Sequence, residues 1–262
     1  MTERSIDIIQ SPHNPSIKRI RSLGNRKTRY AERAFVLEGM RAFSAAIDAG
    51  VEPETVLLAD DAAADLLELA EPFAPRVVAR RLFDQVMETE SPQGIAAIFA
   101  MPASSSPDVE DPLIVMLDGI GDPGNLGTII RTAAAAGADG VVLGPGCVDP
   151  FNAKAVRAAM GSLFALPMWE HSSAVDAWLV ETCPTRVLAD GAGEVTYDAP
   201  IWQGGVAMIV GSEAHGATAW GRGLATARIR IPLTRHIESL NASIAAGILL
   251  FEAQRQRSGA SW

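Results

Sequence analysis

The sequence is poor in the residues that build disulfide frameworks and metal centres. Its 262 residues include two cysteines, Cys147 and Cys183, and four scattered histidines that form no H-x-x-x-H pair. Two cysteines are too few for a disulfide framework or for a cysteine-rich metal site. We therefore expect no metal centre, and the cysteine content favours a reducing cytoplasm as the compartment of the protein.

Long apolar runs are also missing. No uninterrupted apolar segment reaches the ~18–20 residues that a membrane span needs, and the N-terminal residues MTERSIDIIQ lack the pattern of a signal peptide. Hydrophobic residues nevertheless make up 48% of the chain, which is enough to fill one large core or two modest ones. The composition predicts a globular protein without a membrane segment.

Positive charge is scarce overall but concentrated near the N-terminus. The net charge is −9, yet residues 1–35 carry eight basic against three acidic side chains, a local charge of +5. A basic arm on an acidic body can contact nucleic acid locally, although a solvated helix face is an equally good interpretation of a charge run alone. The candidate RNA-binding residues of this arm are Arg19, Arg21, Arg26, Lys27 and Arg29.

A segment rich in serine, proline and acid divides the chain. This segment, MPASSSPDVEDP (residues 101–112), has no apolar period and is predicted to be an exposed linker. Before it, strand-like and helix-like segments alternate, which predicts a small α/β domain over residues 1–100 that includes the basic arm. After it, five apolar strands alternate with helices, which predicts a second α/β domain over residues 113–262 with a mostly parallel sheet.

The stretch VMLDGIGDPGNLGTIIR contains the spacing of the dinucleotide-binding fingerprint. Gly119, Gly121 and Gly124 spell G-x-G-x-x-G after an apolar strand. However, Pro123 removes a backbone donor where a pyrophosphate would need N–H groups. The next strand ends in GPG without the acid that would bind a ribose. A nicotinamide or flavin oxidoreductase is therefore the weaker alternative.

Polar and glycine residues follow three predicted strands of the second domain. The first loop carries Asn125 and Arg131, the second carries Glu213, and the third carries Ser239 and Asn241. Ligands of open α/β sheets bind at the carboxyl ends of the strands, so the three loops point to one ligand site. For each loop taken alone, ordinary turn and helix-capping roles remain the alternative.

Together the three loops resemble the signature motifs of the SpoU family of RNA ribose 2′-O-methyltransferases, in the SPOUT superfamily. The resemblance covers about residues 113–257, and the first domain is similar, more loosely, to the ribosomal-protein-like RNA-binding domain of that family. The motifs are D-P-x-N-x-G-x-x-x-R over residues 122–131, G-S-E-x-x-G over residues 211–216, and I-P-(loop)-S-L-N-x-S over residues 231–243.

The resemblance implies a deep trefoil knot that binds S-adenosylmethionine. The cofactor contacts of the family fall on Gly211, Ile231 and Leu240. We add Leu143 and Gly144 as cofactor-binding candidates, because the glycines of the segment LGPG would let the backbone approach a flat ligand closely. On this interpretation the glycines after residue 118 serve the knot and the catalytic loop.

The same resemblance implies a catalytic set of five residues. Methyl transfer requires a ribose hydroxyl to be aligned and the negative charge that develops on its oxygen to be stabilised. Because a guanidinium keeps its proton at neutral pH, we interpret Arg131 as a phosphate clamp and oxyanion stabiliser rather than a general base. Glu213 and Asn125 are expected to hold the arginine and its loop, and Ser239 and Asn241 to orient the substrate.

The function implied by the resemblance is S-adenosylmethionine-dependent methylation of a ribose 2′-hydroxyl in structured RNA. The basic arm and the separate RNA-binding domain favour ribosomal RNA. A transfer-RNA 2′-O-methyltransferase and a SpoU-like RNA-binding or assembly protein without catalysis are the alternatives.

A homodimer is also implied. The predicted C-terminal helix carries Leu240, Ile244, Ile248 and Phe251 on one side, although burial within one chain would explain that surface as well. Members of the family generally dimerise through the knotted domain, and we expect Arg131 of each chain to complete the active site of the other.

Overall fold

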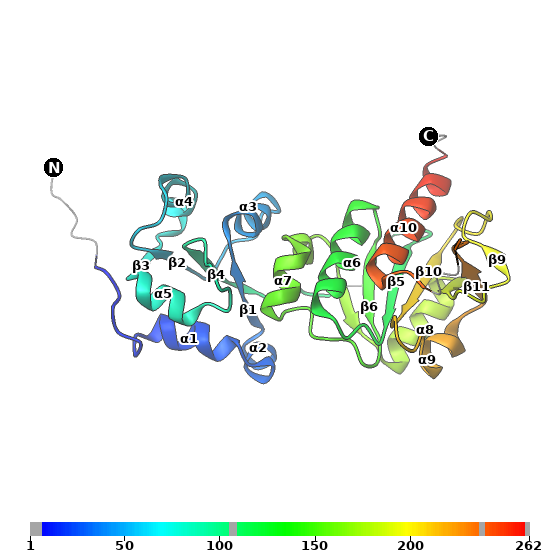
Figure 1. Ribbon diagram of the computed structural model, residues 1–262, viewed down its shortest axis with the longest axis horizontal. Helices are drawn as coiled ribbons and strands as arrows, with labels where there is room; N and C mark the ends of the chain where they lie inside the picture. Colours follow the sequence, from blue (N-terminus) through cyan, green and yellow to red (C-terminus); the bar gives the residue numbers. More distant parts are fainter. Residues whose placement is uncertain (1–6, 105–108, 236–238, 260–262) are drawn as a thin grey trace. The chain divides into compact units, whose positions relative to one another are not determined.

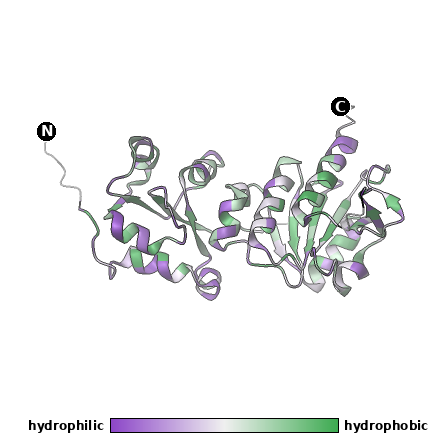
Figure 2. Ribbon diagram, viewed as in Figure 1, coloured by the Kyte–Doolittle hydropathy of each residue, from purple (hydrophilic) through white to green (hydrophobic). Residues whose placement is uncertain are grey.

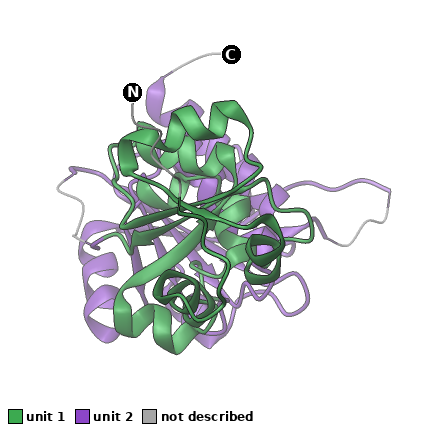
Figure 3. Cartoon of the chain, turned by 90° about the vertical axis from the view of Figure 1, so that its left-hand side faces the viewer, with its two compact units in different colours: residues 1–102, 149–164 green, residues 103–148, 165–262 purple. Residues whose placement is uncertain are grey.

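The protein divides into two compact units (Figures 1 and 3). The computed structural model describes residues 7–104, 109–235 and 239–259. Unit 1 contains residues 1–102 and 149–164, and unit 2 contains residues 103–148 and 165–262. The first division, between residues 102 and 103, lies within the predicted linker, whereas residues 149–164, expected within the second domain, pack with the first.

Unit 1 is built around a four-stranded sheet with the order β1-β4-β2-β3. Strand β4 is antiparallel to both β1 and β2, and β2 is parallel to β3. Its elements are α1 (Pro15–Leu23), α2 (Arg26–Glu32), β1 (Ala34–Glu38), α3 (Met40–Asp48), β2 (Thr55–Ala59), α4 (Ala64–Ala70), η1 (Glu71–Phe73), β3 (Arg76–Val78), α5 (Arg80–Val86), β4 (Ile95–Ala100), α7 (Ala153–Ala159) and η2 (Ser162–Phe164).

The basic N-terminal segment is folded into helices that belong to the core of unit 1. Helix α1 buries Ile17, Ile20 and Leu23 against the sheet at helical spacing. Asn14 and Asn25 cap α1 and α2, each accepting a hydrogen bond from a backbone N–H of the first turn. The predicted arm is therefore a structural part of the unit from Pro15 onward.

The prediction that Arg29 contacts RNA is wrong. Its side chain is buried and donates to Asp149 at 2.5 and 3.1 Å and to the carbonyl oxygens of Leu23 and Gly24, both at 2.7 Å. A guanidinium that is buried and fully engaged cannot bind a phosphate in solvent. Arg19 is partly engaged as well, because it pairs with two carboxylates, those of Glu32 and Glu54.

Residues 149–164 pack on unit 1 through an aromatic cluster. The Phe35 ring lies 5.1 Å from that of Phe151 and 5.7 Å from that of Phe164, and Phe99 lies 5.2 Å from Phe164. These contacts and the buried Arg29–Asp149 pair explain why a segment between two strands of unit 2 belongs to unit 1.

Unit 2 contains a seven-stranded sheet with the order β7-β6-β5-β10-β8-β11-β9, in which every neighbouring pair is parallel. The apolar strands lie between helices on both faces (Figures 1 and 2). Its elements are β5 (Leu113–Asp118), α6 (Pro123–Ala135), β6 (Gly140–Leu143), β7 (Met168–Glu170), α8 (Ser173–Thr182), β8 (Thr185–Ala189), β9 (Val195–Thr196), β10 (Val206–Gly211), α9 (Ala219–Leu224), β11 (Ala227–Arg230) and α10 (Ala242–Ser258).

The predicted α/β class and the mostly parallel sheet are confirmed, and the trefoil knot stays a prediction. Strands β5 and β10 are neighbours at the centre of the sheet, so their carboxyl ends, Asp118 and Gly211, lie opposite each other. The loops that follow these two strands therefore begin side by side at the carboxyl edge of the sheet. In the described part of the chain, no helix has the length and apolar character needed to span a membrane.

Candidate active site

The structure brings one polar residue from each of the three motifs into direct contact. The carboxylate Oε1 of Glu213 accepts hydrogen bonds from Asn125 Nδ2 at 2.9 Å, from Asn241 Nδ2 at 2.6 Å and from the backbone N–H of Ala242 at 2.9 Å. Asn241 Nδ2 also donates to Asn125 Oδ1 at 3.0 Å. The three side chains form a closed triangle, which we call the Asn–Glu–Asn cluster.

Helix capping fixes the two asparagines of this cluster. Asp122 is the N-cap of α6 and accepts from the backbone N–H of Asn125 at 2.8 Å, which holds Asn125 in the first turn. Asn241 is the N-cap of α10, and its Oδ1 accepts from the N–H groups of Ser243 and Ile244 at 3.0 and 3.3 Å. Because that oxygen is occupied, the amide nitrogen of Asn241 is the group turned toward Glu213.

A tight hairpin positions Glu213. The backbone groups of Ser212 and Gly216 hydrogen-bond to each other in both directions, at 3.0 and 2.8 Å. A Cβ atom added at Gly211 would lie 2.3 Å from the backbone nitrogen of Ala217, and Gly216 has a positive φ of 65°. The hairpin thus requires glycine at both ends, and this requirement explains the G-S-E-x-x-G spacing.

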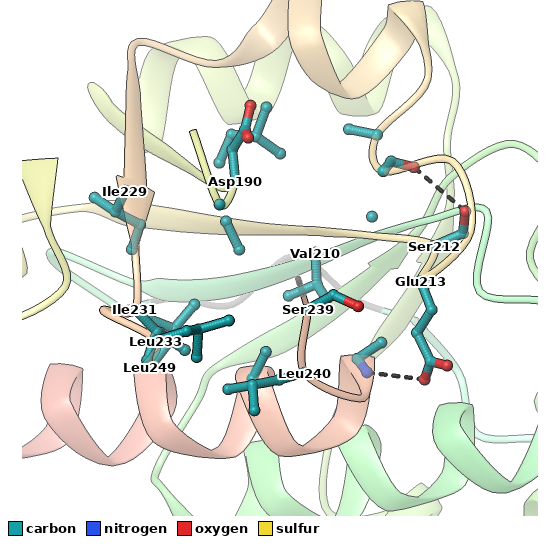
Figure 4. Close-up of a pocket in the computed structure, with 18 of the residues that line it drawn as sticks. Asp190, Val210, Ser212, Glu213, Ile229, Ile231, Leu233, Ser239, Leu240 and Leu249 are labelled. Atoms are coloured by element: carbon teal, nitrogen blue, oxygen red, sulfur yellow. Dashed lines mark hydrogen bonds between the residues drawn. The ribbon is translucent and has the colours of Figure 1, made fainter. Parts of the chain in front are cut away.

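A cavity of about 240 Å³ opens beside the Asn–Glu–Asn cluster (Figure 4). Ile231, Leu233 and Leu249 lie at one end of it, while Ser212 and Glu213 lie at the other. Strand β10 contributes Val210 and Gly211 to the lining, and the glycine presents only backbone there. An apolar end suits a purine, and a polar end beside a carboxylate suits a cationic group. The residues therefore fit an S-adenosylmethionine-like molecule.

Three of the five predicted cofactor-binding residues line this cavity, and two do not. Gly211, Ile231 and Leu240 are lining residues. Leu143 and Gly144 lie elsewhere, so their inclusion is corrected. A Cβ atom at Gly144 would lie 2.2 Å from the ring of Trp220, and this glycine therefore serves the packing of the tryptophan.

Sequence reasoning missed a fourth contribution to the cavity. The end of β8 and the turn after it, Leu188 to Gly191, form one of its walls. The signal was present, because LADG is another strand that ends in an acid and a glycine. No motif pointed to it, and its neighbourhood to β10 and β11 follows only from the strand order.

The two remaining candidate residues lie outside the triangle. Ser239 is exposed and lines the cavity. Arg131 is exposed on α6, and its side chain forms no hydrogen bond or ion pair with another described residue. One chain thus assembles Asn125, Glu213 and Asn241 without its arginine.

The chain matches two protein families that are consistent with this geometry. Residues 112–251 match the SpoU rRNA Methylase family, and residues 14–97 match the MRM3-like substrate binding domain. A curated relative, the 23S rRNA (guanosine(2553)-2′-O)-methyltransferase RlmP of Bacillus subtilis, is 33% identical over 245 residues. These residues span 93% of this chain and 97% of the relative.

Solved structures agree with this match over nearly the whole chain. The SpoU methyltransferase AviRb from Streptomyces viridochromogenes in complex with AdoMet has a TM-score of 0.84 at 29% identity, covering 95% of this chain and all 100% of the other. The AdoMet-bound rRNA methyltransferase from Sinorhizobium meliloti has a TM-score of 0.82 at 34% identity, covering 95% and 97%. The chain therefore belongs to the SpoU rRNA methylase family, with an MRM3-like substrate binding domain in its first unit.

Proposed function

We propose that this protein transfers the methyl group of S-adenosylmethionine to a ribose 2′-hydroxyl in ribosomal RNA. The observation that carries the proposal is the Asn–Glu–Asn cluster, which joins all three family motifs at the polar end of the cavity. A family member without catalysis would have no chemical need for this closed set. The names of RlmP and of the AdoMet-bound structures support both the cofactor and the RNA class.

The residues of the cavity hold the cofactor in this proposal. When bound, S-adenosylmethionine supplies an electrophilic methyl group on a positively charged sulfur. The carboxylate of Glu213, at the polar end, favours a cation there and also fixes the two asparagines. Ser239 lies on the loop before α10 and lines the cavity, which supports a role in orienting the substrate ribose.

Arg131 stabilises the negative charge that develops on the 2′ oxygen. A guanidinium offers several N–H donors in a rigid fork, which suits a phosphate and an adjacent oxyanion. Arg131 lies on α6, six residues after Asn125, and is free to meet a ligand or a second chain because it is exposed.

A homodimer supplies this arginine from the partner chain. Helix α10 leaves Ile244 56% exposed and Phe251 48% exposed, which is unusual for large apolar side chains at helical spacing. Helix α6 packs against α10, and a Cβ atom at Gly247 would lie 3.7 Å from the side chain of Thr132, the neighbour of Arg131. We propose that an isologous interface buries the exposed apolar face of α10 and brings Arg131, on the adjacent helix α6, to the site of the partner chain.

The test is methyl transfer from labelled S-adenosylmethionine to protein-free ribosomal RNA and, in parallel, to total transfer RNA. Methylation of ribosomal RNA by the wild type but not by Arg131→Ala supports the proposal. If only transfer RNA is methylated, the substrate is transfer RNA instead of ribosomal RNA. No transfer to either RNA, by a chain that binds the cofactor in calorimetry, favours the RNA-binding protein without catalysis. The similarity to the bacterial 23S rRNA methyltransferase RlmP favours the cytoplasm as the compartment of the protein.

A further inference from the structure

Unit 1 contains a second cavity, of about 260 Å³, that has no part in the cofactor site. It lies between the start of α3, the loop before β4 and the end of α7. Two of its walls come from the N-terminal domain, and the third comes from residues 149–164, which pack on that domain (Figure 3). The first unit therefore needs this later segment to complete the cavity.

Two arginines provide positive charge at this cavity. Arg41 is exposed in the first turn of α3, and Arg157 is half-buried on α7. Arg157 donates to Thr89 Oγ1 at 3.1 Å, and that hydroxyl donates to the buried carboxylate of Glu38 at 2.6 Å. The other carboxylate oxygen of Glu38 accepts from the backbone N–H of Glu88. Glu38 is thus engaged in fixing the loop, and Arg157 is held in place by it.

Glu38 lines the cavity as well, and the rest of the wall is apolar or carries neutral polar groups. Met160 lines the cavity from a left-handed backbone conformation with a φ of 50°, which is unusual for a residue other than glycine. The next residue, Gly161, fits so closely against α3 that a Cβ atom there would lie 2.6 Å from that of Ala45. Gln93 accepts from the N–H of Met40 at 2.9 Å and joins the loop to α3. Met160 is therefore held in this conformation by tight packing.

From this arrangement we infer that the cavity binds one unpaired nucleotide of the RNA substrate. The base packs against Met160 and Ala42, and its phosphate pairs with Arg41 and Arg157. Proteins that recognise RNA bind bases splayed out from loops and bulges, and arginine binds phosphate through paired N–H groups. A thioether packs well against an aromatic ring. This inference rests on the proposed function, because it assigns a binding site for the same RNA.

Three variants of the full chain separate a nucleotide site from general charge attraction. Arg41→Ala and Arg157→Ala each remove one cation, whereas Ser91→Trp fills the mouth of the cavity from its exposed loop without changing the charge. Lys18→Ala is the matched control, since it removes an exposed cation of α1 in the same unit. The probes are a short single-stranded RNA of mixed sequence and a short RNA duplex, both without cofactor.

The expected result differs between the variants. Ser91→Trp keeps the base out of the cavity, so it weakens binding of the single strand by up to about tenfold, the upper range of a contact between a thioether and a ring, and leaves duplex binding unchanged. Each arginine variant also lowers the slope of log affinity against log salt for the single strand, by at most about 0.7, because both arginines contact one phosphate. Lys18→Ala leaves the affinity for the single strand within about twofold of wild type, as a cation in solvent contributes little.

The inference is overturned if Ser91→Trp binds the single strand as tightly as wild type, or if it loses equal affinity for strand and duplex. The inference is also overturned if Lys18→Ala loses as much affinity for the single strand as the arginine variants do. Methyl transfer by the wild type is measured separately. If the wild type transfers methyl groups and the cavity variants bind RNA as tightly as the wild type does, only this inference is overturned. If the wild type transfers no methyl group, the proposed function is overturned, whatever the cavity binds.

Discussion

At the scale of single residues, Glu213 connects the binding of the cofactor to the placement of the catalytic loops. One of its oxygens accepts three donors, two from asparagine side chains and one from the backbone of α10. Hydrogen bonds to a charged group are among the stronger ones in proteins, so their loss affects all three loops at once.

Glu213→Ala is therefore expected to lower the rate of methyl transfer at saturating substrates by roughly tenfold or more, as each lost bond to a charged group costs about 1.5–3 kcal/mol. Glu213→Gln keeps an acceptor oxygen and should retain part of the rate. Glu181→Ala, which removes an exposed carboxylate of α8, is the control. A wild-type rate in Glu213→Ala would show that the cluster is dispensable.

The buried ion pair between Arg29 and Asp149 predicts a second effect, on stability. Arg29→Met leaves a buried carboxylate without its partner and should lower the free energy of unfolding by about 3–5 kcal/mol. Adding Asp149→Leu should recover much of this loss, since a buried pair can be replaced by apolar groups. Urea unfolding of both variants measures the free energy of unfolding. If Arg29→Met is as stable as the wild type, the assigned ion pair is contradicted.

At the scale of elements, much of the fold could be predicted from the sequence. The strands from Ala34–Glu38 to Ala227–Arg230 that were predicted from apolar runs are present. The short strands Met168–Glu170 and Val195–Thr196 were missed, because two or three residues at a sheet edge carry no readable period. The basic segment was interpreted as an exposed arm because of its charges. The helical spacing of Ile17, Ile20 and Leu23, which pack in the core, was overlooked.

The candidate site could be predicted only where a loop motif carries it. Asn125, Glu213 and Asn241 were predicted because the three loops together resemble the SpoU motifs, and the structure shows a local cause for the capping and turn residues of these loops. The wall from Leu188 to Gly191 was missed although LADG ends a strand in an acid and a glycine, because its position beside β10 and β11 depends on strand order. Gly144 was misassigned for a related reason. In the sequence, a glycine that makes room for a tryptophan ring cannot be distinguished from a glycine that makes room for a ligand.

Helix α10 gives a prediction for the oligomeric state. Ile244→Glu places a charge on its exposed apolar face and should convert a dimer to a monomer, because a buried unpaired charge is costly. Val180→Glu, at a residue 50% exposed on α8, is the matched control and should leave the dimer intact. Sedimentation equilibrium distinguishes the two states. If the variant remains dimeric, the interface lies elsewhere.

At the scale of the whole molecule, a shared active site predicts complementation between two inactive variants. Arg131→Ala lacks the arginine, and Asn241→Ala lacks a member of the cluster. If Arg131 acts on the site of the partner chain, a mixed dimer has one complete site, and activity should reappear after the two variants exchange subunits. Mass spectrometry verifies that the subunits have exchanged. If the exchanged sample is still inactive, each chain uses its own arginine.

Methyl transfer to a ribose oxygen makes the RNA product resistant to alkali at the modified nucleotide. Alkali cleaves RNA through the free 2′-hydroxyl, so a methylated ribose leaves an uncleaved dinucleotide. Ribosomal RNA is incubated with labelled S-adenosylmethionine and the wild-type protein, hydrolysed in alkali and separated by size. We predict that the label appears in dinucleotides and disappears with Arg131→Ala. Label in mononucleotides would place the methyl group on a base and contradict the account.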